Sequence, residues 1–340
     1  MRFVTILVCF IFSHAVPAVA APQRLAEPAS PEAVLGWLNQ YRFKPEPHRV
    51  PEAMRAAGRS GAFKDPDSAG VYVGFLAGVL NANPARAETI IEKILPLPPE
   101  QQWVIVRAIA YSGLPRWKGL MHGFKMHMPG RAVMIDMYLN GKLATPDKLD
   151  FHREKPSLLK RIFASKDEPK EVRFEPTPDI LDTFWGFYFA TGAYEPIARL
   201  VSMLRWSTDD DDVEFLTLGG MAKFTLATNA ARNGELLKML KWTVRYQDEK
   251  TAKILTEVIL AAETVETGKI RKEALAAIEE LKRKGPGYKR KIAGWGQIGQ
   301  GALALGCIGA AAVGAVAVGL PCVIGGAVSS AALNAWATQE

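Results

Sequence analysis

Apolar residues recur at helical spacing in three similar stretches of the chain. In each stretch an apolar helix stops at a small residue followed by Asn or Gly, and a second helix begins a few residues later. Gly and Asn accept the left-handed conformation that ends many helices, so these positions predict turns. The expected turns lie at Asn83, Gly192 and Asn229, and a fourth, more divergent copy turns at Gly113. The pattern therefore predicts helical hairpins.

The second helix of each hairpin carries apolar side chains at positions i, i+1 and i+4, which form one stripe along a helix. These positions are Ile90, Ile91 and Ile94; Leu200, Val201 and Leu204; and Leu236, Leu237 and Leu240. Alternating patterns that indicate strands are poor throughout. We predict an all-α fold of irregular helical hairpins, stacked in the manner of an α-solenoid. The alternative, given the irregular spacing of the turns, is a chance resemblance among ordinary helical hairpins.

Prolines and charged residues divide this pattern into segments. Residues 21–66 predict a Pro-rich, extended N-terminal arm that encloses one short helix near Pro31–Gln40. Residues 143–179 are again rich in proline and charge, and they predict a linker around one short helix. Two sets of helical hairpins are expected on either side of the linker, at residues 67–142 and 180–284.

The first 20 residues predict a secretory signal peptide. Arg2 precedes the apolar run Val4–Phe12, and the segment closes with Ala18-Val19-Ala20, the small-x-small pattern that signal peptidase requires. An apolar core of about nine residues is too short to cross a bilayer, which needs roughly 20. We therefore expect cleavage after Ala20 and export to the periplasm or envelope of a bacterium.

The C-terminal segment, residues 285–340, differs from the rest of the chain in its lack of charge. Lys291 and Glu340 enclose 48 consecutive uncharged residues, and most of these are Ala, Gly or large apolar residues. Cations followed by an indole are typical of a membrane interface, where the cations contact head groups. The predicted interface residues are Lys289, Arg290, Lys291 and Trp295. Membrane attachment of this tail is the favoured interpretation, with packing on the helical body and self-association as alternatives.

Small residues at every fourth position of the tail predict a helix face that allows close approach of another helix. They are Ala302, Gly306, Ala310 and Gly314. On one continuous helix Cys307 and Cys322 would lie about 22 Å apart, whereas a disulfide needs Cα atoms within about 7 Å. A Cys307–Cys322 disulfide therefore predicts a bent hairpin, and free cysteines allow a straight span. A basic cluster on the outer side of the inner membrane would oppose the positive-inside tendency, which favours the hairpin.

The charge distribution argues against a nucleic-acid partner. The formal net charge is +7, from 42 Lys and Arg against 35 Asp and Glu. Six positive charges cluster within residues 282–291, beside the apolar tail, and no basic face is spread over the helical body. Apolar residues at 49% and charged residues at 23% are normal for a packed globular protein.

The motifs of common catalytic sites do not occur in the sequence. There is no Gly-x-Ser-x-Gly, no phosphate-binding Gly-x-x-x-x-Gly-Lys-Ser/Thr, no His-Glu-x-x-His and no Cys-x-x-Cys. The stretch "MHGFKMHM" is a candidate copper site, because thioether and imidazole ligands suit copper in an exported protein. Its candidate ligands are His122, Met126, His127 and Met128. The alternative is that Met121, Phe124 and Met128 fill a core while the histidines edge it.

The aromatic run "FWGFYF", residues 184–189, suggests either packing between hairpins or the wall of a ligand groove, and packing is favoured. The blocks "DILDTFWGFYFATGAYEPIARLVSML" and "AIAYSGLPRWKGLM" resemble segments of uncharacterised exported bacterial helical-hairpin proteins. This resemblance covers about half of the chain and implies no activity.

Together these features predict a non-enzymatic, exported helical scaffold that binds proteins and associates with membrane lipid through its tail. No cofactor is expected. A membrane-disrupting or translocated effector is the first alternative, and a periplasmic copper-binding protein is the second.

Overall fold

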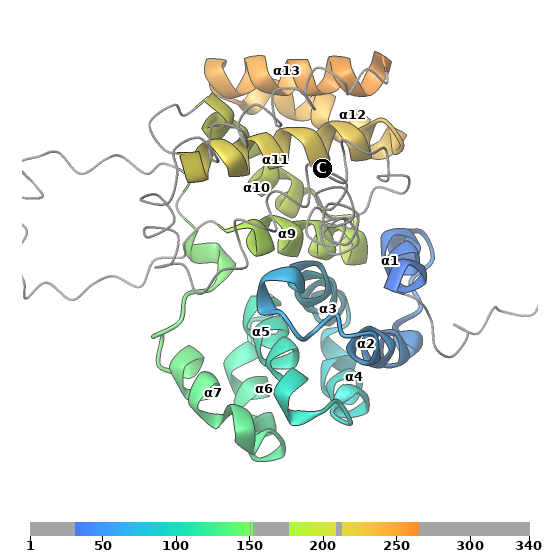
Figure 1. Ribbon diagram of the computed structural model, residues 1–340, viewed down its shortest axis with the longest axis vertical. Helices are drawn as coiled ribbons and strands as arrows, with labels where there is room; N and C mark the ends of the chain where they lie inside the picture. The colour runs from blue at the N-terminus through green and yellow to red at the C-terminus, as the bar shows by residue number, and fades with distance from the viewer. Residues whose placement is uncertain (1–30, 150, 152–176, 209–212, 265–340) are drawn as a thin grey trace, which may run out of the picture.

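The computed structural model describes residues 31–149, 151, 177–208 and 213–264, and in this part of the chain the fold is all-α. Twelve α-helices joined by turns and short 3₁₀ helices make up the described part, which contains no strand (Figure 1). The predicted all-α fold is therefore confirmed. The α-helices that precede residue 150 are α1 (Pro31–Gln40), α2 (Val50–Arg59), α3 (Gly70–Ala82), α4 (Ala87–Ile94), α5 (Trp103–Tyr111), α6 (Trp117–Phe124) and α7 (Ala132–Leu139). Those that follow are α9 (Pro178–Thr191), α10 (Tyr194–Met203), α11 (Val213–Ala230), α12 (Gly234–Thr243) and α13 (Glu249–Thr264).

The helices form two arrays that meet at α3 and α9. In the first array, α3 to α7, helix α5 packs against α3, and α6 and α7 follow outward. In the second array, α9 to α13, helices α10, α11, α12 and α13 follow outward in the opposite direction (Figure 1). In chain order, each array therefore starts at the α3–α9 junction and extends outward from it. This order differs from a single solenoid, in which repeats stack from one end to the other in chain order.

Glycines bring the backbones of α3 and α9 into direct contact. Gly70, Gly74 and Gly78 recur every fourth residue on α3, and Gly186 lies opposite them on α9. A Cβ atom at Gly74 would lie 1.9 Å from the Thr183 carbonyl oxygen, and one at Gly186 would lie 2.0 Å from the Val71 carbonyl oxygen. No side chain fits in these gaps. The glycines therefore make the closest helix pair of the described structure possible.

Residues 31–66, the described part of the N-terminal segment, are largely helical and packed, which corrects the expectation of an extended arm over that part of residues 21–66. Helix α1 lies where it was predicted, but Val50–Arg59 forms a further helix, α2, whose Val50 and Met54 side chains are fully buried. Pro51 lies in the first turn of α2. Backbone N–H groups there have no acceptor within the helix, so the N–H that proline lacks is not needed. Pro31, Pro47, Pro51 and Pro66 thus lie at the starts of helices, whereas Pro45 lies between two of them. Tyr41 anchors the segment to the first array, with its ring 5.0 Å from that of Phe75 on α3.

The chain turns at Asn83, Gly113 and Gly192 as predicted, but only the two glycines are left-handed, and the fourth position, Asn229, lies inside a helix. Gly113 and Gly192 both adopt the left-handed conformation, each with φ of 66°. Asn83 follows the end of α3 but has φ of −131°, outside that region. Asn229 lies inside α11, where its side-chain amide donates to the Thr225 carbonyl. The cap at this turn is Asn233, whose Oδ1 accepts hydrogen bonds from the first backbone N–H groups of α12.

The apolar stripes and the aromatic run pack in the core. The stripe residues on α4 and α10 are buried, and on α12 Leu236 and Leu240 are buried while Leu237 is partly buried. In the run 184–189, Trp185 is fully buried and its Nε1 donates to Thr225 Oγ1 on α11 at 3.1 Å. Trp185, Tyr188 and Phe189 are thus packed between helices, as the favoured interpretation predicts, whereas Phe184 and Phe187 also line the crevice described below.

Several predicted features lie outside the described residues. They are the signal peptide, most of the linker between the hairpin sets, and the whole tail 285–340 with its interface, helix-packing and disulfide candidates. Among the helices that the structure describes, none combines the length and the apolar character needed to cross a bilayer.

Candidate functional site

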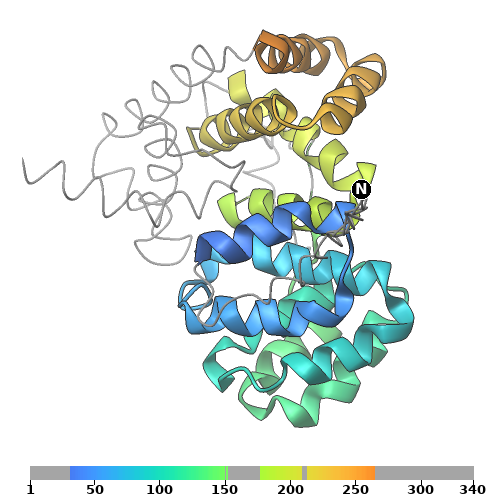
Figure 2. The same cartoon turned by 90° about the vertical axis from the view of Figure 1, so that its right-hand side faces the viewer.

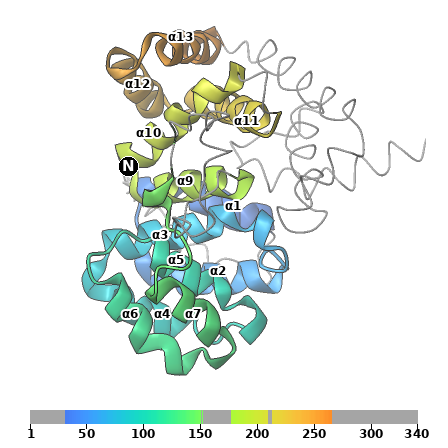
Figure 3. The same cartoon turned by 90° about the vertical axis from the view of Figure 1, so that its left-hand side faces the viewer.

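A crevice of about 650 Å³ lies where the two arrays meet. One wall comes from the first array, through the turn between α5 and α6, and the other comes from α9 and α10 of the second array. The connecting segment, residues 140–149, closes one side as it passes from the end of α7 toward α9 and α10 (Figure 3). This volume falls in the range of roughly 300–1,000 Å³ in which proteins hold ligands.

Helix α10 holds the connecting segment in place. Arg199 on α10 donates a hydrogen bond from Nη1 to the Pro146 carbonyl oxygen at 3.1 Å, and its Nε donates to Glu195 at 2.7 Å. Beyond the segment, the Phe151 ring stacks on Trp206 with centroids 5.8 Å apart. Thr145, in the wall of the crevice, has an extended backbone with φ of −113° and ψ of 160°. The next residues, Pro146–Lys148, form a short 3₁₀ helix, so this side of the crevice is an irregular segment.

The lining of the crevice combines aromatic and charged side chains. Phe184 and Phe187 of α9 face Trp117 and Leu114 of the first array, and Lys118, Glu195 and Arg199 bring charge to the lining. The Ser112 hydroxyl donates to the Ile109 carbonyl and accepts from the Leu114 N–H. Both of these hydrogen bonds are made within the turn between α5 and α6. The lining contains neither His nor Cys.

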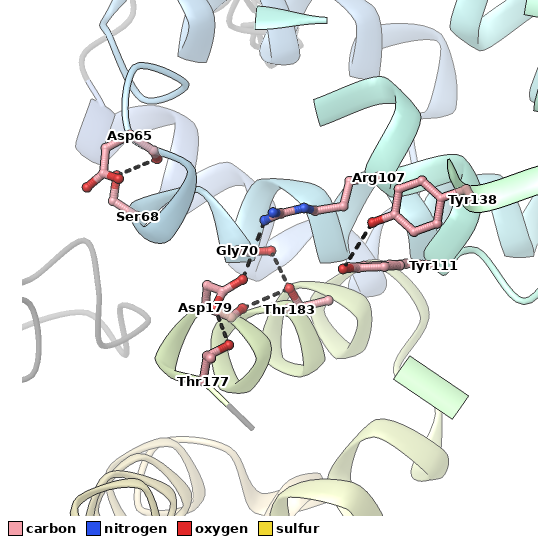
Figure 4. A network of polar contacts seen from close by, with 9 residues as sticks. All are labelled: Asp65, Ser68, Gly70, Arg107, Tyr111, Tyr138, Thr177, Asp179 and Thr183. Atoms are coloured by element: carbon pink, nitrogen blue, oxygen red, sulfur yellow. Dashed lines mark hydrogen bonds and ion pairs between the residues drawn. The ribbon is translucent and has the colours of Figure 1, made fainter. Parts of the chain in front are cut away.

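A polar network couples the arrays beside this crevice (Figure 4). Arg107 of α5 forms an ion pair with Asp179 in the first turn of α9, with Nη1 and Oδ2 3.5 Å apart. On the same α9 turn, the Thr183 hydroxyl donates to the Asp179 carbonyl at 2.8 Å and lies 3.2 Å from the Gly70 carbonyl of α3. Since the ion pair and the Thr183–Gly70 contact each join one array to the other, the network fixes their relative position.

Burial sets the protonation behaviour of this network. Desolvation raises the pKa of Asp179 above its ordinary value, and the Arg107 guanidinium opposes part of that rise. The hydroxyls of Tyr111 and Tyr138 lie 3.4 Å apart, and burial raises the pKa of both tyrosines while Arg107 again opposes the rise. Both phenols are therefore neutral at physiological pH.

The Asp179→Asn variant is expected to flatten the pH dependence of stability. Because the folded state raises the pKa of Asp179, it binds a proton more tightly than the unfolded chain does. The free energy of unfolding should then fall as pH rises from about 4, the ordinary carboxyl value, through the raised pKa. The amide of the variant cannot titrate, so the variant should gain stability relative to the wild type over this window.

Urea unfolding between pH 4 and pH 7 measures this difference. The matched control is Glu88→Gln, which removes an exposed carboxylate on α4. Parallel stability curves for the wild type and Asp179→Asn would contradict the assignment of this pH dependence to Asp179.

The residues of the candidate copper site differ in exposure. Met128 is fully buried in the core together with Met121 and Phe124, whereas Met126 is 85% exposed and both His122 and His127 are exposed. The core therefore contains Met121, Phe124 and Met128, as the alternative interpretation predicts. No group of three or more His, Cys, Asp or Glu residues able to hold a metal occurs in the part of the chain that the structure covers. Copper binding stays a prediction, and Met128 would have to leave the core to take part.

No protein-family model matches the chain, and neither a curated protein nor a solved structure matches it significantly. The resemblance to exported bacterial helical-hairpin proteins therefore stays a prediction.

Proposed function

We propose that this protein is a non-enzymatic helical scaffold of the bacterial envelope, which binds a segment of a partner polypeptide in the junction crevice. Its C-terminal tail, residues 285–340, attaches it to a membrane. The observation that supports partner binding best is the crevice itself, whose walls belong to two arrays that meet across α3 and α9. Ligand sites commonly form where two structural units meet.

The crevice lining favours a peptide segment as the ligand, because it combines aromatic rings with charged side chains. The partly exposed rings of Trp117 and Phe187 offer apolar surface for side chains of such a peptide, and the exposed Lys118 offers a charged donor. Binding of this kind needs no cofactor.

A photocrosslinking amino acid in place of Trp117 is expected to capture a partner protein in cells of the native host. Trp117 is half-buried and lines the crevice, so a bound segment would lie within reach of the probe. The matched control carries the same amino acid at Thr256, an exposed position on α13 outside the crevice lining. The adduct should form from position 117 and be absent from position 256.

A second variant tests whether the captured segment lies between the two walls. Phe187 lines the crevice from α9, the wall that faces Trp117. Phe187→Glu places a charge on that apolar wall and should abolish the adduct formed from position 117. An adduct that persists in this variant, or equal adducts from positions 117 and 256, would rule out the crevice as the binding site.

A further inference from the structure

Cations outnumber acids at the junction crevice. The charged residues of the lining are the cations Lys118, Lys148 and Arg199 and the acids Asp147 and Glu195. The exposed residues that adjoin the lining in the chain add two further cations and no acid. These two are Arg116, beside Trp117, and Lys142, between Gly141 and Leu143. Five cations and two acids therefore stand at the crevice or directly beside it.

Both acids of the lining have partners within the protein. The Glu195 carboxylate accepts a hydrogen bond from Arg199 Nε at 2.7 Å, so these two charges neutralise each other. The Asp147 carboxylate accepts a hydrogen bond from the Thr145 hydroxyl. A third acid, Asp182, adjoins the lining in the chain, but its side chain is fully buried. One exposed carboxylate, that of Asp147, is thus left to balance the other cations.

The other cations are exposed, and among the described residues no carboxylate forms an ion pair with any of them. They are Arg116, Lys118, Lys142 and Lys148. The Lys118 Nζ donates a hydrogen bond to the Leu139 carbonyl at 3.3 Å, and this acceptor carries no net charge. A cleft lined by an excess of one charge attracts groups of the opposite sign. The crevice therefore favours an acidic ligand over a basic one.

The neighbouring elements do not cancel this charge. Asp136 on α7 forms an ion pair with Lys125 at 2.7 Å, and Asp179 on α9 forms one with Arg107 at 3.5 Å. None of the residues that line the crevice in the described structure belongs to α1 or α2. These two helices pack on the opposite side of the α3–α9 pair, in front in Figure 2. Their acidic residues therefore lie away from the crevice.

The positions of the cations and the aromatic rings indicate an amphipathic ligand. The cations that lack a carboxylate partner belong to α6 and the turn before it, or to the connecting segment. The α9 wall instead offers Phe184 and Phe187, and the Trp117 ring comes from the other wall. A ligand that is charged throughout, such as a polyphosphate, would leave the partly exposed rings of Trp117 and Phe187 in water. An acidic peptide with one large apolar side chain can contact both kinds of group.

We infer that the junction crevice binds an acidic segment of the partner polypeptide, in which carboxylates flank a large apolar side chain. This inference rests on the proposed binding of a partner in the crevice, and it adds the chemistry of that partner. The apolar side chain lies between Trp117 and Phe187, and the carboxylates pair with Lys118 and Lys148. Complementary charges of this kind raise the rate of association and select among partners.

Charge reversal at the crevice tests this chemistry in cells of the native host, with the photocrosslinking amino acid at position 117. Lys118→Glu with Lys148→Glu should reduce the adduct about tenfold, because each change replaces an attraction with a repulsion. Replacing the same two lysines by Gln should give a smaller reduction. The matched control is Lys250→Glu with Lys253→Glu, two exposed lysines on α13 outside the crevice lining. It changes the net charge equally and should leave the adduct unchanged.

The identity of the crosslinked segment separates the possible failures. Mass spectrometry of the digested adduct should find more Asp and Glu than Lys and Arg beside the crosslinked residue. A neutral or basic segment, an adduct that persists after charge reversal at positions 118 and 148, or an equal loss in the control would overturn the inference. Each of these results would leave the proposed binding of a partner intact. The absence of any adduct from position 117, or an adduct that nuclease digests, would overturn both.

Discussion

Gly74→Ala is expected to lower the free energy of unfolding by about 2 kcal/mol or more, because it forces α3 and α9 apart. The added Cβ would lie 1.9 Å from the Thr183 carbonyl oxygen, far inside any real contact. The obstacle is backbone, which cannot rotate away as the end of a side chain can. Overpacking costs typically about 1–3 kcal/mol and more at rigid sites, whereas the better helix propensity of alanine returns at most about 1 kcal/mol. The steric cost is therefore larger than the gain in helix propensity, and the variant should be less stable than the wild type.

Gly186→Ala should behave in the same way, since its Cβ would lie 2.0 Å from the Val71 carbonyl oxygen across the same contact. The matched control is Gly123→Ala on α6, where a Cβ meets no atom within 4 Å. There the helix propensity acts alone, and the variant should be more stable than the wild type by up to about 1 kcal/mol. Urea unfolding followed by circular dichroism compares the three variants. Similar effects at positions 74 and 123 would show that α3 and α9 are not in backbone contact.

The same substitutions connect the fold to the proposed site. The crevice has Trp117 on one wall and Phe187 on the other, and their separation depends on how closely α3 and α9 approach. Gly74→Ala should therefore also reduce the crosslinked adduct formed from position 117. Gly123→Ala should leave it unchanged.

Local sequence patterns predict the helices well and the turns in part. The stripe Ile90, Ile91 and Ile94 is buried as expected, because a helix with one apolar face has to cover that face. Gly192 ends α9 in the left-handed conformation, which glycine adopts at little cost. The turn predicted at Asn229 is wrong because asparagine occurs both inside helices and at their ends. Its neighbours in the fold determine which of the two places it takes. Asn233, four residues later, caps α12 through its side chain.

The N-terminal segment shows why composition alone is a weak guide. Pro47 and Pro51 both lie in the first turn of a helix. Proline lacks a backbone N–H, which breaks a hydrogen bond in a helix interior but costs none in the first turn. The apolar spacing of Val50 and Met54 is the better indicator, since both side chains are buried. A short amphipathic pattern therefore outweighs a high proline content when the prolines precede it.

The crevice could not be predicted, because its walls come from residues far apart in the sequence. Ser112, Pro146 and Phe187 become neighbours only after α9 packs on α3. The spacing of Gly70, Gly74 and Gly78 is a signal in the sequence for close helix packing. This spacing identifies α3 as one helix of a close pair. It does not identify α9 as the other, because α9 has a single glycine, Gly186, and no repeated spacing. Pairing of the arrays is thus a property of the folded chain.

Residues 292–340 are expected to decide whether the protein is found with membranes. The 48 residues that precede Glu340 are uncharged, and burial of their apolar groups in lipid is favourable. Each buried CH₂ group contributes about 0.8 kcal/mol. Deleting residues 292–340 leaves every helix up to the end of α13 at Thr264 in place, so the helical body should fold in the shortened chain. A deletion of residues 337–340 alone, which spares the apolar tract, is the matched control.

Carbonate extraction of the membrane fraction, with immunodetection of the full-length chain and the two deletions, tests the proposed membrane-attached scaffold most directly. The full-length chain and the 337–340 deletion should stay in the membrane pellet, and the 292–340 deletion should be released into the soluble fraction. Release of the full-length chain by carbonate would contradict the account.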